Sequence, residues 1–330
     1  MVRLFTAAAL LGLMVCAAFA ASLDPASINS AEFHARTSNG IDAGVVKVQV
    51  LLDRARFSPG EIDGKLAENT QKALTAFAEA NGLTFQKSLT QELWDRLAGA
   101  SQDPVIVQYT VAEGDVKGPF LKKLPARMDD MKGIKVLAYT SPREAIAEKF
   151  HMSEALLAAL NPRSRFDRAG EVISVANVAV QRPKLAIARI EVDKARQTVK
   201  ALDRDGALLA YFPATVGSEE KPTPTGSLKV VSIDANPTYR YNPAYRFKGV
   251  RSKSAFTINP GPNNPVGLYW IGLSAEGYGI HGTPTPSKIS KSESHGCVRL
   301  TNWDVALLAA GVRKGTPVDF VEGKVADGRS

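Results

Sequence analysis

Residues 278–300 read YGIHGTPTPSKISKSESHGCVRL, and this stretch is the most informative part of the sequence for both fold and chemistry. It contains two of the four histidines of the chain, His281 and His295, and one of its two cysteines, Cys297. A thiol is mostly protonated at neutral pH, so a nucleophilic cysteine needs a neighbouring imidazole or another positive group to form the thiolate. The pattern therefore predicts nucleophilic catalysis by Cys297.

The spacing of these residues suggests how they meet. If the end of the stretch is extended, the alternation of strand side chains places His295, Cys297 and Arg299 on one face. Gly296 removes the side chain before the cysteine, so we expect backbone N–H groups there to approach a substrate carbonyl as an oxyanion hole. A second imidazole, His281, is expected to reach Cys297 from an adjacent strand.

Other interpretations of the same residues stay open. A lone thiol is also typical of a buried structural cysteine. His281, His295 and Cys297 would supply three zinc ligands and leave a position for water. The short His-x-Cys spacing and the lack of a nearby carboxylate base favour catalysis without a metal or cofactor. Papain-like hydrolysis fits poorly, because in that group the cysteine precedes the histidine.

The first residues predict export. Arg3 precedes an apolar run over residues 4–19, and the small-residue pattern AFA at residues 18–20 is typical of a signal-peptidase site. The run is too short and too rich in alanine for a membrane helix, which needs roughly 20 residues. We therefore expect residues 1–20 to be a signal peptide and the mature protein to reach the periplasm or the cell wall.

Removal of that segment would take Cys16 with it. Cys297 would then have no intramolecular disulfide partner, so a free thiol in an oxidising compartment again points to catalysis. A lipoprotein is the alternative for Cys16, but Val15 stands where that motif requires Gly, Ala or Ser. The formal net charge of +8 suits an anionic partner such as a cell-wall polymer. The scattered Lys and Arg residues argue against nucleic acid.

The pattern beyond residue 40 divides into three blocks, so we predict a multidomain protein. Residues 40–100 read as a small all-α domain, with Ala73, Leu74, Phe77 and Ala80 at helical spacing and Thr90 as the cap of a short last helix. Residues 105–180 read as strand, helix, helix, strand, a small α+β module with an insertion over residues 118–135. Residues 184–323 read as a mostly-β domain with one strong helix over residues 302–310.

The whole C-terminal pattern resembles the catalytic domain of bacterial L,D-transpeptidases over about residues 185–322. The matching residues are Tyr278-Gly279-Ile280-His281-Gly282-Thr283, then Ser294-His295-Gly296-Cys297-Val298-Arg299-Leu300 with Asn302 and Asp304, and upstream Thr223-Pro224-Thr225-Gly226. The resemblance implies a two-step acyl transfer. In the first step Cys297 attacks a peptidoglycan stem tetrapeptide before its terminal D-Ala, expels D-Ala and forms a thioester.

The resemblance also implies the roles of the other site residues. His281 is the proton acceptor for Cys297, and the carbonyl of Gly282 orients its ring. The remaining residues surround the thiol, with His295 and Gly296 beside the nucleophile and Arg299, Ser294 and Tyr278 at the substrate. For Arg299 a solvent-facing or fold-stabilising role remains the alternative.

An amine acceptor resolves the thioester in this family. The side-chain amine of a second stem gives a 3-3 crosslink, a lysine of an outer-membrane lipoprotein gives a tether, and a free D-amino acid gives exchange. Water would make the enzyme an L,D-carboxypeptidase. The resemblance also implies inhibition by carbapenems.

The two N-terminal blocks resemble wall-binding modules. Residues 45–97 are similar to the peptidoglycan-binding domain through Gly60-Glu61-Ile62-Asp63-Gly64 and the Leu89-Thr90 to Trp94 finish, but Ala78 stands where that family usually has Gln. Residues 108–175 are similar to a LysM module, apart from the insertion. Glycan is therefore an expected partner. A non-catalytic wall-binding protein, or spacers in place of binding modules, are the alternatives.

Overall fold

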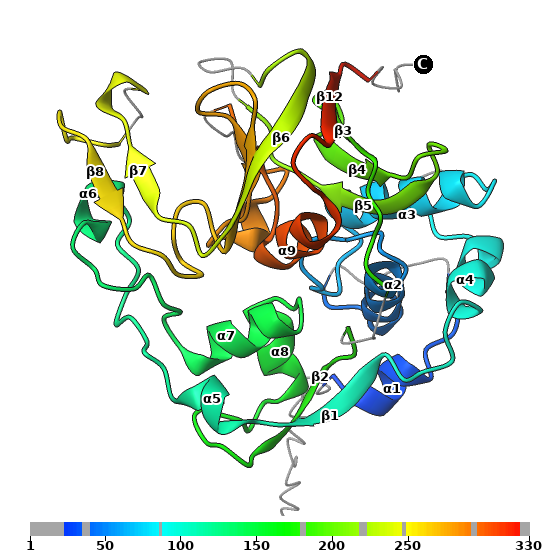
Figure 1. Ribbon diagram of the computed structural model, residues 1–330. Helices are drawn as coiled ribbons and strands as arrows, with labels where there is room; N and C mark the ends of the chain where they lie inside the picture. The colour runs from blue at the N-terminus through cyan, green and yellow to red at the C-terminus, as the bar shows by residue number, and fades with distance from the viewer. Residues whose placement is uncertain are drawn as a thin grey trace, which may run out of the picture.

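The computed structural model describes residues 23–34, 40–85, 88–178, 183–217, 223–245, 249–291 and 296–323. The predicted signal peptide lies outside these ranges, so its prediction is untested. Within them no helix is both long and apolar enough to cross a bilayer. Figure 1 shows a β-rich C-terminal half above a largely helical N-terminal half that curves beneath it.

The first part of the chain is helical, as predicted. Its helices are α1 (Pro25–Asn29), α2 (Ala43–Arg54), α3 (Glu68–Ala80) and α4 (Gln91–Ala98). Asp42 and Thr90 begin α2 and α4 by accepting from the backbone N–H of Val45 and Leu93. First-turn N–H groups have no partner inside a helix, so these caps determine where each helix starts. The cap predicted at Thr90 is confirmed.

Gln49 on α2 holds the turn that precedes α3. Its side chain is 0% exposed, and Oε1 accepts from the backbone N–H of Asp63 at 3.0 Å and of Gly64 at 2.7 Å. Its Nε2 donates to Asp63 Oδ1, Thr70 Oγ1 and the Lys65 carbonyl. Every polar atom of this buried amide is therefore satisfied, and α2, the turn and α3 become one packed unit.

The middle part has the predicted order of strand, helices and strand. Its elements are β1 (Ile106–Thr110), α5 (Glu113–Val116), α6 (Met128–Met131), α7 (Pro142–Lys149), α8 (Glu154–Leu160) and β2 (Val172–Ala176). β1 and β2 pair antiparallel. Ser141 and Ser153 cap α7 and α8. The insertion predicted over residues 118–135 contains α6.

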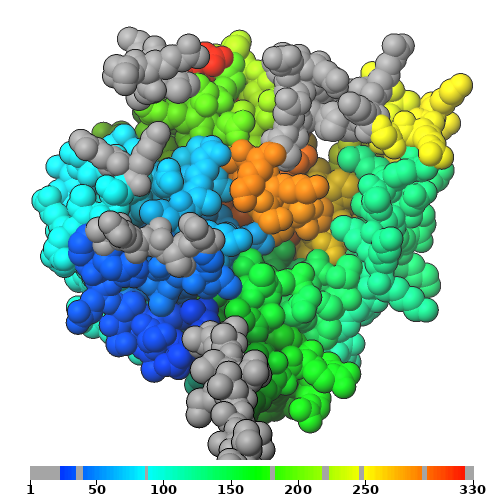
Figure 2. Space-filling view, turned by 180° about the vertical axis from the view of Figure 1, so that it is seen from behind, coloured from blue at the N-terminus to red at the C-terminus, as the bar shows by residue number. Residues whose placement is uncertain are grey.

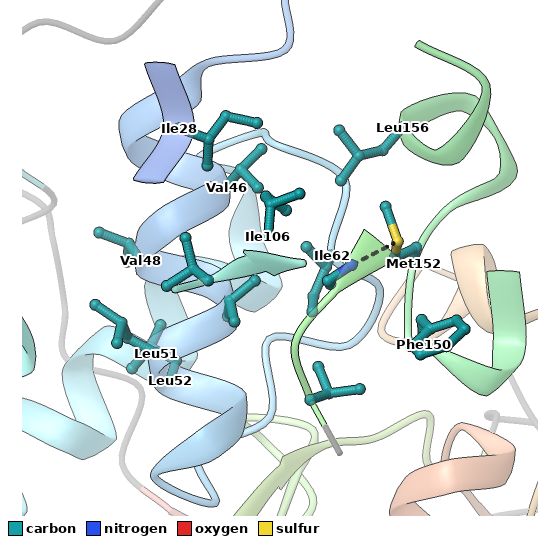
Figure 3. Close-up of a cluster of buried hydrophobic side chains, with 14 of the residues drawn as sticks. Ile28, Val46, Val48, Leu51, Leu52, Ile62, Ile106, Phe150, Met152 and Leu156 are labelled. Carbon is teal, nitrogen blue, oxygen red and sulfur yellow. Dashed lines mark hydrogen bonds between the residues drawn. The ribbon is translucent and has the colours of Figure 1, made fainter. Parts of the chain in front are cut away.

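A single hydrophobic core joins these two parts. Ile28, Val46 and Leu52 from the first helices pack in the same cluster as Ile106 of β1 and Leu156 of α8 (Figure 3). The sequence pattern suggests two separately folded modules, but in the structure neither part has a closed apolar core of its own. Burial of apolar surface is non-directional, so adjacent amphipathic faces close one core together.

The C-terminal part is built on a mixed sheet. Its strands are β3 (Arg189–Asp193), β4 (Thr198–Leu202), β5 (Leu208–Pro213), β6 (Gly226–Ala235), β9 (Tyr269–Leu273), β10 (Gly279–His281), β11 (Val298–Arg299) and β12 (Pro317–Val321). Among the described residues, these eight strands pair in the order β11-β10-β9-β6-β12-β3-β4-β5. Only β12–β3 and β10–β11 of these pairs are parallel. The mostly-β class predicted for this part is confirmed.

One strong helix accompanies the sheet, again as predicted. α9 (Asn302–Gly311) begins at the cap Thr301, whose Oγ1 accepts from the Asp304 N–H at 3.1 Å. Val305 and Leu308 of α9 are 0% exposed and belong to the second hydrophobic core, which is formed with the sheet. α9, which follows β11, therefore packs against the sheet.

A smaller third cluster lies at the far edge of the molecule. β7 (Tyr239–Tyr241) and β8 (Phe256–Ile258) pair antiparallel, and short 3-10 turns occupy Pro243–Tyr245 and Pro286–Lys288. The insertion with α6 runs up to β7 and β8 (Figure 1) and packs Met131 and Leu137 against Tyr241 and Ile258. Part of the middle block is thus bound to the C-terminal half.

Further contacts join the first helices to the C-terminal half. Ser58 Oγ donates to Asp304 Oδ2 at 2.9 Å, and Asn69 Nδ2 donates to the Ile289 carbonyl at 3.1 Å. Ser58 N–H also donates to the Tyr211 carbonyl at 2.9 Å. In Figure 2 the surface around residues 280–291 (orange) lies between the N-terminal helices (blue) and the middle part (green).

Replacement of Gln49 tests the buried network. Gln49→Met keeps the volume but leaves the N–H groups of Asp63 and Gly64 without their acceptor, so we expect a loss of about 2–4 kcal/mol in unfolding free energy. Urea unfolding followed by circular dichroism measures the loss. The control is Gln91→Met, at an exposed side chain bonded only to Asp95, with an expected change below about 0.5 kcal/mol. Equal stability of the two variants would contradict the role of Gln49.

Candidate active site

His281 ends β10, next to the edge strand β11. Its side chain is only 5% exposed, and Nδ1 lies 2.6 Å from the Gly282 carbonyl oxygen. A carbonyl oxygen only accepts hydrogen bonds, so Nδ1 must carry the proton. In the neutral ring Nε2 therefore has a free lone pair, which is the state that a general base requires.

The surroundings keep this ring neutral. Burial and, next, the positive charge of Arg299 lower the pKa of His281 from 6.5 to about 3, against the opposing effect of its hydrogen bond to Gly282. The ring is consequently unprotonated at neutral pH and available to take a proton.

An aromatic residue that the sequence analysis did not identify fixes the plane of the ring. Trp270 of β9 is the cross-strand partner of His281, and the two rings stack at 5.6 Å with an interplanar angle of 16°. A Cβ on Gly279 would lie 2.5 Å from the indole, so the glycine leaves room for it. Gly272 and Gly279 both lie against the Trp270 side chain. Glycines inside strands are the sequence signal that would have suggested a large ring packed here.

Cys297 precedes β11 and lies beside the same strand pair. Parallel pairing of Ile280 with Val298 places Cys297 just before the strand that lies next to β10, which ends at His281. The thiol is half-buried, and Sγ donates to the Gly277 carbonyl at 3.6 Å. Gly296 has φ 93°, a conformation that L side chains rarely adopt, so a glycine is required immediately before the thiol.

Arg299 brings a positive charge to this group. It pairs with His281 across the β10–β11 ladder and exchanges backbone hydrogen bonds with Thr215 at 2.8 and 2.9 Å. Burial lowers the pKa of Arg299, and the interaction with Cys297 opposes this shift. Its Nε is buried without a hydrogen-bond partner among the described residues. Arg299 is partly exposed, but its buried Nε and its charge interactions with Cys297 and His281 do not fit a purely solvent-facing role.

Asn302 packs against Gly282, whose carbonyl accepts from His281 Nδ1. Its side chain is 1% exposed, and a Cβ on Gly267 or Gly282 would lie 2.1 or 2.2 Å from its Oδ1. Oδ1 also accepts from the Leu268 N–H at 3.0 Å. Two glycines thus make the space in which this amide fits.

Of the predicted site residues Tyr278, Ser294 and His295, the structure describes Tyr278. Tyr278 is half-buried against the second core, and its backbone carbonyl accepts from the Leu273 N–H at 3.0 Å. Ser294 and His295 lie outside the described residues. Within the described ranges no group of three or more His, Cys, Asp or Glu side chains is arranged to hold a metal ion. The zinc alternative includes His295, so it is not tested.

Comparisons with known proteins match the C-terminal half. The family model YkuD, described as an L,D-transpeptidase catalytic domain, matches residues 187–320. The Bacillus licheniformis protein YkuD, named as a candidate L,D-transpeptidase, is 31% identical over 177 residues, which are 54% of this chain and 92% of that protein. The Escherichia coli protein YbiS, named in the same way, is 28% identical over 56% of this chain and 61% of its own length.

A solved structure of low overall similarity covers about half of the chain. L,D-transpeptidase 3 from Mycobacterium tuberculosis is 18% identical, with a TM-score of 0.34, and the match covers 47% of this chain and 76% of that one.

The buried imidazole predicts a pH dependence of stability. The pKa of His281 is lower in the folded protein than in the unfolded chain. Its contribution to the free energy of unfolding is therefore fully present above about pH 6.5 and is lost as the pH falls towards 3. Between pH 7 and pH 5 the native protein should lose about 2 kcal/mol that His281→Gln does not lose. Urea unfolding of both proteins at each pH measures this difference. Parallel pH profiles would show that the ring is not held neutral.

Proposed function

The chain belongs to the L,D-transpeptidase family of enzymes, and from this premise we propose that Cys297 and His281 carry out its acyl transfer. The observation that supports the proposal most directly is the tautomer of His281. A buried imidazole with its proton on Nδ1 presents Nε2 as a base, and the strand that follows Cys297 is adjacent. The chemistry needs this combination of base and thiol.

The first step transfers the acyl group to the enzyme. His281 Nε2 accepts the thiol proton while Sγ forms a bond to the carbonyl carbon before the terminal D-Ala of a stem tetrapeptide. The positive charge of Arg299 favours the thiolate form of the nucleophile. Backbone N–H groups around Gly296 stabilise the oxyanion. The C–N bond then breaks, D-Ala leaves as its amine with the proton from His281, and a thioester remains.

The second step reverses the roles. An acceptor amine attacks the thioester carbonyl, His281 takes up its proton, and the thiol is released with a new amide bond. Candidate acceptors are a second stem, which gives a 3-3 crosslink, an outer-membrane lipoprotein lysine and a free D-amino acid. Water in place of the amine would give L,D-carboxypeptidase activity. Muropeptide analysis of cells with and without the protein distinguishes these outcomes.

The proposal extends to the surroundings of the enzyme. Export to the periplasm or cell wall agrees with the apolar run and the AFA pattern of residues 1–20. Residues 40–100 and 105–180 are proposed to contact peptidoglycan glycan, on the basis of their sequence patterns. Ser294, His295 and Tyr278 are proposed to complete the substrate site around Arg299.

The nucleophile is tested by mass spectrometry. The native protein, incubated with a tetrapeptide donor, should gain the mass of the donor less D-Ala, and with a carbapenem it should gain the mass of the drug. Cys297→Ala should form neither adduct and melt at the temperature of the native protein, since the thiol is half-buried and its removal leaves little cavity. Retained turnover by this variant would remove Cys297 from the mechanism.

The base is tested by alkylation of the thiol. A free thiol has a pKa of about 8.5 and is only a few per cent thiolate at pH 7, so His281→Ala should slow the reaction of Cys297 with iodoacetamide at pH 7 by about tenfold, and by about 30-fold at most. His295→Ala is the matched comparison, with the other imidazole of the motif. If only His295→Ala slows alkylation, His295 is the base and the assignment of His281 is wrong.

A further inference from the structure

A partly buried carboxylate from the middle part reaches the C-terminal half. Glu148 lies on α7, outside residues 187–320 that match the family, and accepts from Asn302 Nδ2 at 3.0 Å through Oε1 and 3.2 Å through Oε2. Tyr139 OH also donates to Oε1, at 2.8 Å. α7 packs against α9 (Figure 1), which carries Asn302. Burial raises the pKa of Glu148 to about 7, while the hydrogen bonds from Tyr139 and Asn302 oppose this shift.

This carboxylate is one of the groups that fix which way the Asn302 amide faces. An amide has a donor end and an acceptor end of similar shape, so its partners decide its orientation. In its charged form Glu148 only accepts from Nδ2, as does the Pro262 carbonyl at 3.2 Å. Oδ1 is consequently directed to the Leu268 N–H and into the space left by Gly267 and Gly282.

The orientation matters because Gly282 holds the catalytic imidazole. Asn302 Oδ1 lies against Gly282, and the Gly282 carbonyl accepts from His281 Nδ1 at 2.6 Å. A rotated amide would direct its NH₂ group at the Leu268 N–H, two donors facing each other. The loop with Gly267 and Gly282 would then have to move, and the carbonyl that fixes the His281 tautomer would move with it.

The segment that delivers Glu148 is itself firmly attached. Leu137 N–H donates to the Pro260 carbonyl at 2.9 Å and its carbonyl accepts from the Asn263 N–H at 2.8 Å. Asn263 Nδ2 donates to Glu144 Oε1 at 2.9 Å. A Cβ on Gly261 would lie 2.3 Å from the Leu137 carbonyl oxygen, so only glycine allows this approach. α7 therefore cannot shift independently of the loop behind His281.

We propose that Glu148 is a positioning residue for His281, acting through the Asn302 amide and the Gly282 peptide, so that the middle part of the chain completes the active site. The inference rests on the proposed roles of His281 and Cys297. It assigns to α7 a task within the reaction, in addition to any contact with the wall.

The test compares two substitutions of similar size. Glu148→Met removes the acceptor, and Glu148→Gln keeps one oxygen that accepts from both Asn302 and Tyr139. We expect Glu148→Met to lower kcat for tetrapeptide acylation about tenfold or more, with KM within about twofold, because a small misplacement of a catalytic group is costly. Glu148→Gln should restore most of kcat. The control is Glu154→Ala, which removes a carboxylate on the neighbouring helix that, among the described residues, pairs with exposed Arg143.

Two further measurements separate positioning from stability and from the proposed function. The His281 Nδ1–H proton resonance, assigned with His281→Gln, should shift in Glu148→Met and stay near its native position in Glu148→Gln. Iodoacetamide alkylation of Cys297 should slow in the same order, and neither measurement needs a peptide donor. If the native protein lacked tetrapeptide turnover but both readouts still followed Glu148, the proposed function would fail and the positioning role would stand.

The opposite results overturn the inference. An unchanged His281 resonance and native alkylation in a folded Glu148→Met protein would mean that Glu148 only stabilises the contact between the two parts. Tyr139→Phe serves if Glu148→Met does not fold, because it keeps the carboxylate and removes one donor. It should give a smaller change of resonance in the same direction, and no change at all would also contradict the proposal.

Discussion

The hydrogen bond from His281 Nδ1 to the Gly282 carbonyl is the interaction that the other parts of the site support. It is short, buried and made to a group that can only accept, so it selects one tautomer. Trp270 fixes the plane of the ring, and the glycines around it create the space for both. The positive charge of Arg299 and the loss of solvent keep the ring neutral. The active site is thus organised around a single protonation state.

The N-terminal half contributes to this organisation as well as to the shape of the molecule. The sequence patterns describe it as two binding modules beside an enzyme, which would affect only where catalysis takes place. In the structure the two halves are joined more closely than that. Hydrogen bonds link the C-terminal half to Ser58, Asn69, Glu144 and Glu148. The Ser58–Asp304 contact is buried and the others are partly buried, and breaking such contacts is costly because each leaves an unsatisfied group. The family match begins at residue 187, but the packed structure does not divide there.

Local signals in the sequence predicted much of this, and they failed where distant segments meet. Helix caps at Thr90 and Thr301 and the strand alternation after residue 184 depend on neighbouring residues, so the helices and most strands were predictable. The motif also predicted that the strand of His281 lies next to the segment of Cys297, and β10 and β11 do pair. The Trp270 stack, the shared N-terminal core and the bond from Glu148 to Asn302 depend on packing between segments up to 154 residues apart. Nothing in a local pattern encodes such pairing.

The bond between Ser58 and Asp304 joins residues 246 positions apart, and β3 pairs with β12 near the end of the described chain. Contacts of such sequence separation form late, because the entropy of closing the loop must be overcome before they stabilise anything. The first helices can therefore reach their final packing only after α9 and β12 have been synthesised. Cys297 and His281, the proposed nucleophile and base, would thus acquire their final arrangement late in folding. A nascent chain would carry an inactive thiol.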